Sequence, residues 1–274
     1  MTEFNKKAIE EIVDSNIKKF AMGLEERYIN ELNDPNGVIH RKKNNCFISE
    51  LGREFMFYSA FVRSFDSSFG KVLENIGNSI AKLNYKVKSE VSSFLLPQQS
   101  QHIDYLMLNY EKHMKPKVED YKKYNIMIPN DVRSFAKKHK TDHYFYDEEN
   151  KTHYLIELKS SGDLDNKKAK TEKIALLQEY FILKNSINLD EDIKIFLATA
   201  YNIYGEGNYW KQDRVRQFFS DDELMIGRKY WNFVCKDEKG FEIFFNQYKK
   251  SCNYIRKVLS QIKNLYFLDE TEID

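Results

Sequence analysis

The sequence of 274 residues predicts an α/β fold, in which a central β-sheet is flanked by helices and preceded by a helical N-terminal region. Three observations favour this fold class. Apolar residues recur at helical spacing near the N-terminus, two aromatic-rich runs flank a polar turn near the middle, and a nearly all-apolar run follows a further helical segment. With 42% apolar and 15% aromatic residues, the chain can form an ordered core.

The N-terminal segment is expected to be helical. Apolar residues between positions 8 and 32 follow the helical period, and the turn sequence Asn-Asp-Pro-Asn-Gly at 33–37 ends this helix. A second helix is expected over residues 47–65. Ser67 and Ser68 are then expected to cap a third helix, over residues 69–83, because serine side chains bind the free amides at a helix start.

The sheet is expected to begin with a strand over residues 87–95, followed by an insertion, a hairpin, a helix and a buried strand. The helix is capped by Asp163 or Asp165 and runs to about residue 184, and the buried strand covers residues 193–200. We expect a single domain with three regions: a helical region at 1–65, a core at 66–235 with an insertion at 97–140, and a strand and helix region at 236–274.

The hairpin carries the most informative residues of the chain. Side chains alternate along a strand, so Glu157 and Lys159 share one face. A two-residue loop at 149–150 would place Asp142 directly opposite Glu157. A four-residue loop would move this pairing by two residues and keep the face, whereas an odd loop would break it. Two carboxylates and an amine would then converge at the end of the hairpin.

This set of side chains suits metal-dependent hydrolysis. Mg²⁺ takes oxygen ligands, and two carboxylates leave its other positions to water and a substrate phosphate. Metal binding lowers the pKa of water from about 15.7 toward roughly 7 in the strongest cases. Lys159 could orient that water and offset charge on the phosphate. The alternative is a solvated edge hairpin that carries an ordinary Glu-Leu-Lys triplet.

Asp142 followed by Glu157-Leu158-Lys159 resembles the signature of the PD-(D/E)XK nuclease superfamily. Longer strings between residues 157 and 219, among them Gly-Glu-Gly-Asn-Tyr-Trp-Lys-Gln and Arg-Val-Arg-Gln-Phe-Phe, resemble the type II restriction endonuclease family typified by TdeIII. The resemblance implies a restriction-endonuclease-like core with a central mixed β-sheet flanked by helices. It also implies that Asp142 and Glu157 bind the metal and that Lys159 is the catalytic lysine. Thr141 replaces the proline of the signature.

A third acidic group is expected on a helix. In this superfamily a carboxylate of the core helix often reaches the metal site, and Glu74 stands among apolar residues of the third expected helix. Glu74 is therefore the candidate third metal ligand, with Glu50 and Glu54 as weaker candidates. The alternative is that Glu74 faces solvent.

The net charge of +1 means that any DNA-binding site must be a local patch of basic residues. Such residues occur at the start of the helix that follows the hairpin, before the hairpin, and after the last expected strand. They are Lys167, Lys168, Lys170 and Lys173; Arg133, Lys137 and Lys138; and Lys211, Arg214 and Arg216. The first groups could bind phosphates and the last could read bases, although lysines on an exposed helix are usually only solvated.

Other motifs point away from rival chemistries. The three cysteines include no CxxC pair and fit buried thiols in a reducing cytoplasm. The histidines at 139, 143 and 153 lack an HExxH motif, so zinc is not expected, and the chain has no phosphate-binding loop. No apolar run is long enough for a membrane span.

The predicted function is that of a Mg²⁺-dependent type II restriction endonuclease. It would cut double-stranded DNA at a short palindromic site as a cytoplasmic homodimer, and a DNA methyltransferase would protect the host DNA. Two alternatives stay open: a structure-specific DNA repair nuclease of the same superfamily, and a catalytically inactive DNA-binding module.

Overall fold

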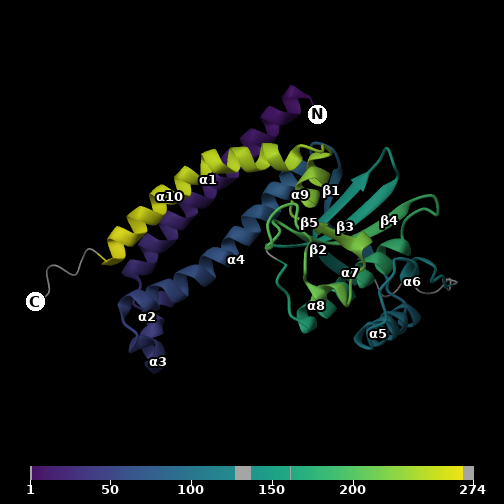
Figure 1. The fold of residues 1–274 in the computed structure, drawn as a ribbon, viewed down its shortest axis with the longest axis horizontal. Coiled ribbons are helices and arrows are strands. Elements are labelled where there is room, and N and C mark those ends of the chain that lie inside the picture. The colour runs from purple at the N-terminus through teal and green to yellow at the C-terminus, as the bar shows by residue number, and fades with distance from the viewer. Residues whose placement is uncertain (1, 127–136, 161, 268–274) are drawn as a thin grey trace, which may run out of the picture. The chain divides into compact units, whose positions relative to one another are not determined.

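The computed structural model describes residues 2–126, 137–160 and 162–267. The chain forms two compact units (Figure 1). Residues up to 76 and from 242 onward form a helical unit, and residues 77–241 form a unit built on a β-sheet. Over the described residues, no helix combines the length and the apolarity needed to cross a membrane.

In the part of the chain that the structure describes, the helical unit is built from three long helices and three short ones. These are α1 (Glu3–Asn33), α4 (Arg53–Ala81) and α10 (Gly240–Phe267), with α2 (Val38–Arg41), η1 (Lys42–Asn44) and α3 (Cys46–Ser49). Helices α1 and α10 lie side by side (Figure 1). Ser251 and Gln247 of α10 both donate hydrogen bonds to Asp14 of α1. Helix α4 carries a phenylalanine every fourth residue, and these rings pack against α1 and α10: Phe57, Phe61, Phe65 and Phe69.

The first helix was predicted correctly, but the next two expected helices are not separate. Residues 53–81 form one continuous helix, α4, preceded by the single turn of α3. Ser68 does not cap a helix, because its hydroxyl donates backward to the carbonyls of Ser64 (2.8 Å) and Phe65 (3.1 Å) within α4. A serine that bonds in this way fits inside a helix instead of starting one.

The second unit contains a five-stranded sheet in the order β1-β2-β3-β4-β5. Its strands are β1 (Lys86–Ser93), β2 (Lys137–Asp147), β3 (Thr152–Lys159), β4 (Asp192–Thr199) and β5 (Leu224–Ile226). The first three strands pair antiparallel and the last three pair parallel, so the expected mixed sheet is confirmed.

Helices cover both faces of this sheet. On one face, α7 (Asn166–Lys184) buries Leu176 and Leu177 against Leu155 and Leu197 of the strands, together with α5 (Pro97–Glu111) of the insertion. On the other face, Phe233 of α9 (Arg228–Cys235) packs its ring against the sheet. The remaining short elements are α6 (Glu119–Lys122), α8 (Asp213–Arg216) and η3 (Asp221–Glu223).

Two smaller expectations need correction. A strand and a helix were expected in the region from residue 236 onward. Up to residue 267, where the description ends, this region holds the helix α10 and no strand, and β5 lies before it in the sequence. Of the three cysteines, Cys235 is buried and Cys252 is half-buried, but Cys46 is exposed at the start of α3, so the expectation of three buried thiols is wrong there.

The hairpin loop contains four residues, 148–151, because Asp147 pairs with Thr152. The register is nevertheless the one expected for a two-residue loop, since the two additional loop residues lie one on each side of the turn. His143 pairs with Ile156, and continuing this register by one residue places Asp142 opposite Glu157. The expectation that a four-residue loop would move the register is therefore wrong, while the pairing of Asp142 itself lies one residue beyond the observed ladder and stays a prediction.

Candidate active site

The structure brings Glu157 and Lys159 together at the carboxyl end of β3. The Lys159 Nζ lies 2.5 Å from Glu157 Oε1 and 2.9 Å from Oε1 of Glu172, which projects from α7. All three side chains are less than one-third exposed. The ammonium group is therefore held between two carboxylates, one from the strand and one from the helix that covers it.

Asp142 lies on β2 at an irregularity of the sheet. Lys88 pairs with Tyr144 and Glu90 with Lys140, so one residue of β1 stands opposite three residues of β2. Such a bulge redirects side chains and bends the strand. The bulge is anchored from α4, because Asn78 Nδ2 donates to the carbonyl of Asp142 at 3.1 Å.

The neighbouring residue, His143, is buried and neutral. Its Nδ1 lies 2.9 Å from Asn78 Oδ1 and its Nε2 lies 2.9 Å from the Tyr230 hydroxyl. Because Asn78 uses its amide nitrogen on Asp142, its oxygen accepts from His143, and the Tyr230 hydroxyl then donates to Nε2. Burial lowers the pKa of His143 to about 3. His143 therefore adds a rigid support behind Asp142 and no positive charge.

The surroundings of Glu157 favour its protonated form. Burial raises the pKa of Glu157 to about 8, and the charge of Asp142 adds to this rise, while Lys159 opposes it. The pKa of Lys159 is raised, because its attraction to Glu157 and Glu172 outweighs the effect of burial. The site thus has a permanently charged ammonium group and more negative charge than this group neutralises.

Helix α7 adds a second carboxylate, Glu179, which is 3% exposed. Burial, followed by the charges of Glu157 and Asp142, raises the pKa of Glu179 to about 9, and its Oε1 lies 2.9 Å from His139 Nδ1. Sequence reasoning missed both Glu172 and Glu179. The available signal was their seven-residue spacing on either side of Leu176, which places them on the apolar face of the helix.

The basic residues expected at the start of α7 differ in their surroundings. Lys167 and Lys168 are exposed beside the N-cap residue Asp165, as expected. Lys170 forms an ion pair with Glu111 of α5 at 2.7 Å. Lys173 is fully buried and forms an ion pair with Glu223, so the expectation that it belongs to an exposed basic group is wrong.

The other predicted site residues are distributed as follows. Lys211 and Arg214 are exposed, whereas Arg216 is committed within the protein: it pairs with Asp221, donates to the Trp210 carbonyl and stacks on Tyr209. Arg133 and the side chains of Lys137 and Lys138 lie outside the described residues. Glu74 is half-buried on the part of α4 that belongs to the helical unit, and its role as a ligand stays a prediction.

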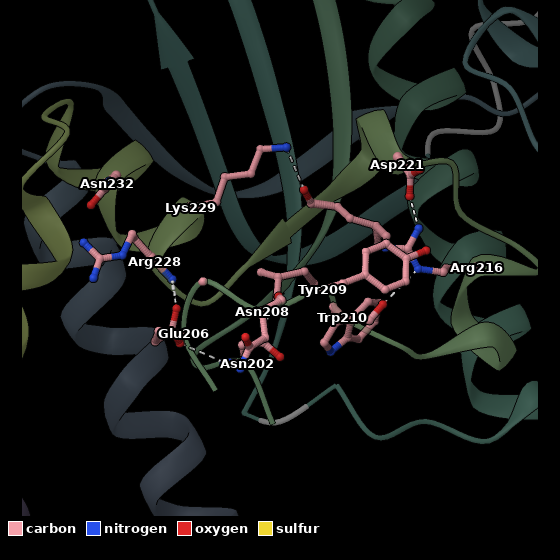
Figure 2. A pocket seen from close by; sticks show the side chains of 13 residues that line it. Asn202, Glu206, Asn208, Tyr209, Trp210, Arg216, Asp221, Arg228, Lys229 and Asn232 are labelled. Carbon is pink, nitrogen blue, oxygen red and sulfur yellow. Dashed lines mark hydrogen bonds and ion pairs between the residues drawn. The ribbon is translucent and has the colours of Figure 1, made fainter. Parts of the chain in front are cut away.

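A cavity of about 560 Å³ lies beyond the carboxyl ends of β4 and β5 (Figure 2). Trp210 lines it and packs against Gly162, three residues after Lys159. Gly162 has a φ of +70°, and a Cβ there would lie 2.4 Å from Thr199 Cγ2 and 2.9 Å from Trp210 Cζ2. Since Thr199 is the sheet partner of Lys159 and Trp210 contacts Gly162, the cavity wall lies next to the carboxyl end of β3.

A mixed five-stranded sheet flanked by helices is consistent with the restriction endonuclease fold. Its carboxylates and lysine lie at the carboxyl end of β3. The family model described as "Type II restriction endonuclease, HinfI" matches residues 5–252. The chain therefore belongs to the HinfI family of type II restriction endonucleases, which are site-specific deoxyribonucleases that bind double-stranded DNA. The finer resemblance to the TdeIII family is not confirmed. Comparison with curated proteins and with solved structures gave no match.

Proposed function

We propose that the chain hydrolyses phosphodiester bonds in double-stranded DNA at a short palindromic site, with Mg²⁺ as cofactor and a catalytic set of the PD-(D/E)XK type. The observation that carries the proposal is the position of Lys159 between Glu157 and Glu172, with Asp142 on the adjacent strand. Asp142 and Glu157 would hold the metal, and Lys159 would act on the substrate phosphate.

The two carboxylates fit a hard divalent cation. Burial, and after it the charges of Asp142 and Glu172, raise the pKa of Glu157, and a bound cation would oppose this by favouring the ionised carboxylate. Within the described residues no group of three or more His, Cys, Asp or Glu side chains is arranged as a metal site. Mg²⁺ does not need one, because it commonly binds through one or two carboxylates together with water and substrate phosphate. When bound, it would supply an activated water and a Lewis acid.

The protein's own contribution comes from the ammonium group of Lys159. Because the pKa of Lys159 is raised, it stays protonated at neutral pH and can donate hydrogen bonds to a phosphate on which negative charge develops. Glu172, from α7, and Glu157 both accept from this ammonium group and fix its position. A fixed donor in a partly buried site stabilises the transition state more than a mobile lysine would.

The same proposal includes the assembly. One catalytic set cuts one strand, so two copies related by a two-fold axis would cut both strands of a palindrome. A homodimer of this kind in the cytoplasm would work with a DNA methyltransferase that modifies the same sequence and protects the host DNA.

The decisive experiment is the digestion of a sequenced plasmid with Mg²⁺, Ca²⁺ or a chelator. Discrete fragments are expected with Mg²⁺ and none with the chelator. Ca²⁺ should support specific binding without cleavage, because it binds the same oxygens at longer distances. Asp142→Ala and Glu157→Ala should abolish cleavage, whereas Glu148→Ala, in the loop at the other end of the hairpin, should not. Normal rates in both active-site variants would contradict the assignment.

Two alternative functions make different predictions in the same assay. A structure-specific repair nuclease would leave the intact plasmid uncut and would cleave nicked, flapped or branched DNA. An inactive DNA-binding module would cut neither kind of DNA. The match to a restriction endonuclease family over most of the chain favours site-specific cleavage over both alternatives.

A further inference from the structure

The loop that follows β4, residues 201–212, is held in one conformation by its own side chains. The carboxylate of Glu206 accepts hydrogen bonds from the backbone amides of Asn202 (2.9 Å) and Arg228 (3.0 Å), the second at the start of α9. Asn202 Nδ2 donates to the carbonyl of Asn208 at 2.7 Å. Gly227 makes the close approach possible, because a Cβ there would lie 2.3 Å from Glu206 Oε1. The loop is therefore rigid before any ligand binds.

Asn208 is an exposed polar residue of this loop and lines the cavity. Its side-chain nitrogen donates one hydrogen to the carbonyl of Tyr204 at 2.6 Å, which fixes the plane of the amide. An asparagine amide has two donor hydrogens and an acceptor oxygen. The second hydrogen and the oxygen of Asn208 have no hydrogen-bond partner among the described residues. A fixed donor and a fixed acceptor thus stand next to each other on an exposed side chain.

The neighbouring side chains limit what can bind there. Asn208, Tyr209 and Trp210 line the cavity together (Figure 2). Tyr209 is 63% exposed and its ring is supported from behind by Arg216 at 4.5 Å. Arg216 is itself paired with Asp221 and is therefore not available to read a base. The surface combines a flat aromatic ring with the fixed amide of Asn208, as expected for a contact with a planar polar ligand.

The cavity lies within reach of DNA bound at the catalytic lysine. Lys159 is the sheet partner of Thr199, and Thr199 is the partner of Ile226, which lines the cavity. Neighbouring strands are about 4.8 Å apart, so the cavity wall is about 10 Å from the catalytic strand. This corresponds to about three steps along a DNA strand at about 3.4 Å each. Bases within about three steps of a phosphate at Lys159 would therefore be within reach of the cavity.

We propose that Asn208 reads an adenine of the target sequence through the major groove. Adenine presents an acceptor, N7, beside a donor, the N6 amino group, and this pattern matches the donor and acceptor of an asparagine amide. Guanine presents two acceptors at the same edge and would leave the oxygen of Asn208 without a partner. The inference rests on the proposed function, since it names a residue that selects the site at which the enzyme cuts.

The test uses the full-length enzyme and its mapped recognition site. Duplexes carrying each single base-pair change, and duplexes with 7-deazaadenine in place of each adenine, are cut by the wild type, Asn208→Ala and Asn208→Asp. Asn188→Ala is the matched control, because Asn188 is also an exposed asparagine held through Nδ2, by Glu191 at 3.3 Å, in the loop at the opposite end of β4. Thermal unfolding curves of each variant show what fraction is folded, so that all assays use the same concentration of folded protein.

In both Asn208 variants, cleavage of the recognition site should fall about tenfold to a hundredfold. At one adenine position, base changes and 7-deazaadenine should cause no further loss, while Asn188→Ala should behave like the wild type. Unchanged discrimination at every position would overturn the proposal, and so would a loss confined to another base. An equal loss on all sequences, with a smaller salt dependence, would instead indicate a phosphate contact. Failure of the wild type to cut any duplex would overturn the proposed function itself, which is a distinguishable result.

Discussion

The binding of a cation at the candidate active site should depend steeply on pH. Glu157 has a pKa raised to about 8, so at pH 7 only about one molecule in ten has this carboxylate ionised before metal binds. A metal binds the ionised form, and its apparent affinity therefore falls about tenfold for each pH unit below 8. The Mg²⁺ concentration that gives half-maximal cleavage should rise about fiftyfold between pH 8 and pH 6 and level off above about pH 9.

This dependence can be measured by single-turnover cleavage over a series of Mg²⁺ concentrations at each pH. Glu172→Gln offers a second measurement, because the charge of Glu172 contributes to the raised pKa of Glu157. Its removal should shift the pH at which the dependence begins to a lower value. Glu148→Gln, which removes a charge at the far end of the hairpin, should leave it unchanged. A half-maximal Mg²⁺ concentration that is constant between pH 6 and pH 8 would refute the reasoning.

Three further outcomes are expected. Lys159→Ala should lower the single-turnover cleavage rate about a hundredfold or more with little effect on DNA binding. Lys167→Ala should weaken DNA binding and reduce its salt dependence by about one unit of slope. The opposite pattern would show that the two roles are exchanged. Lys173→Met should lower the free energy of unfolding by about 3–5 kcal/mol in urea titrations, since it leaves Glu223 buried without its partner, and a loss below about 1 kcal/mol would contradict this. The pKa of His143 is lowered from 6.5 to about 3 in the folded state, so the unfolded chain binds this proton more readily. The contribution of His143 to stability is therefore complete above pH 6.5 and falls by about 1.4 kcal/mol for each pH unit below that value. His143→Gln should remove this part of the pH dependence of the unfolding free energy.

The hairpin could be predicted from sequence because its signals are local. Alternation of apolar and polar residues identifies each strand, and the polar turn between the strands limits the possible registers to a few. One of these registers places Asp142 opposite Glu157, and the observed pairing of His143 with Ile156 belongs to that register. The bulge opposite β1 could not be predicted, because it depends on a strand about fifty residues earlier in the chain.

The two serines before residue 69 show why helix boundaries are harder to predict. A serine hydroxyl can accept a bond from a free amide at a helix start, or it can donate to a carbonyl one turn earlier. Both uses occur in similar sequences. In α4 the regular spacing of phenylalanines against α1 and α10 holds the helix together through Ser67 and Ser68, so tertiary packing decides between the two.

The acidic residues of α7 depend on the same kind of long-range information. Glu172 and Glu179 belong to the site because α7 packs on the face of the sheet that carries Glu157 and Lys159. The sequence shows that α7 has an apolar face, but it does not show which face of the sheet the helix covers. A carboxylate on that apolar face was the available indication, since burying it requires a partner.

The contact between Gly162 and Trp210 has a consequence for the accuracy of the enzyme. Trp210 belongs to the loop that presents Asn208, and Gly162 stands three residues after Lys159, with no space for a methyl group between them. With the proposed roles of Asn208 in reading and Lys159 in catalysis, a loop displaced by a wrong base would push on Gly162. Errors in reading would therefore also disturb cutting, and a single glycine would link the choice of sequence to the rate of cleavage.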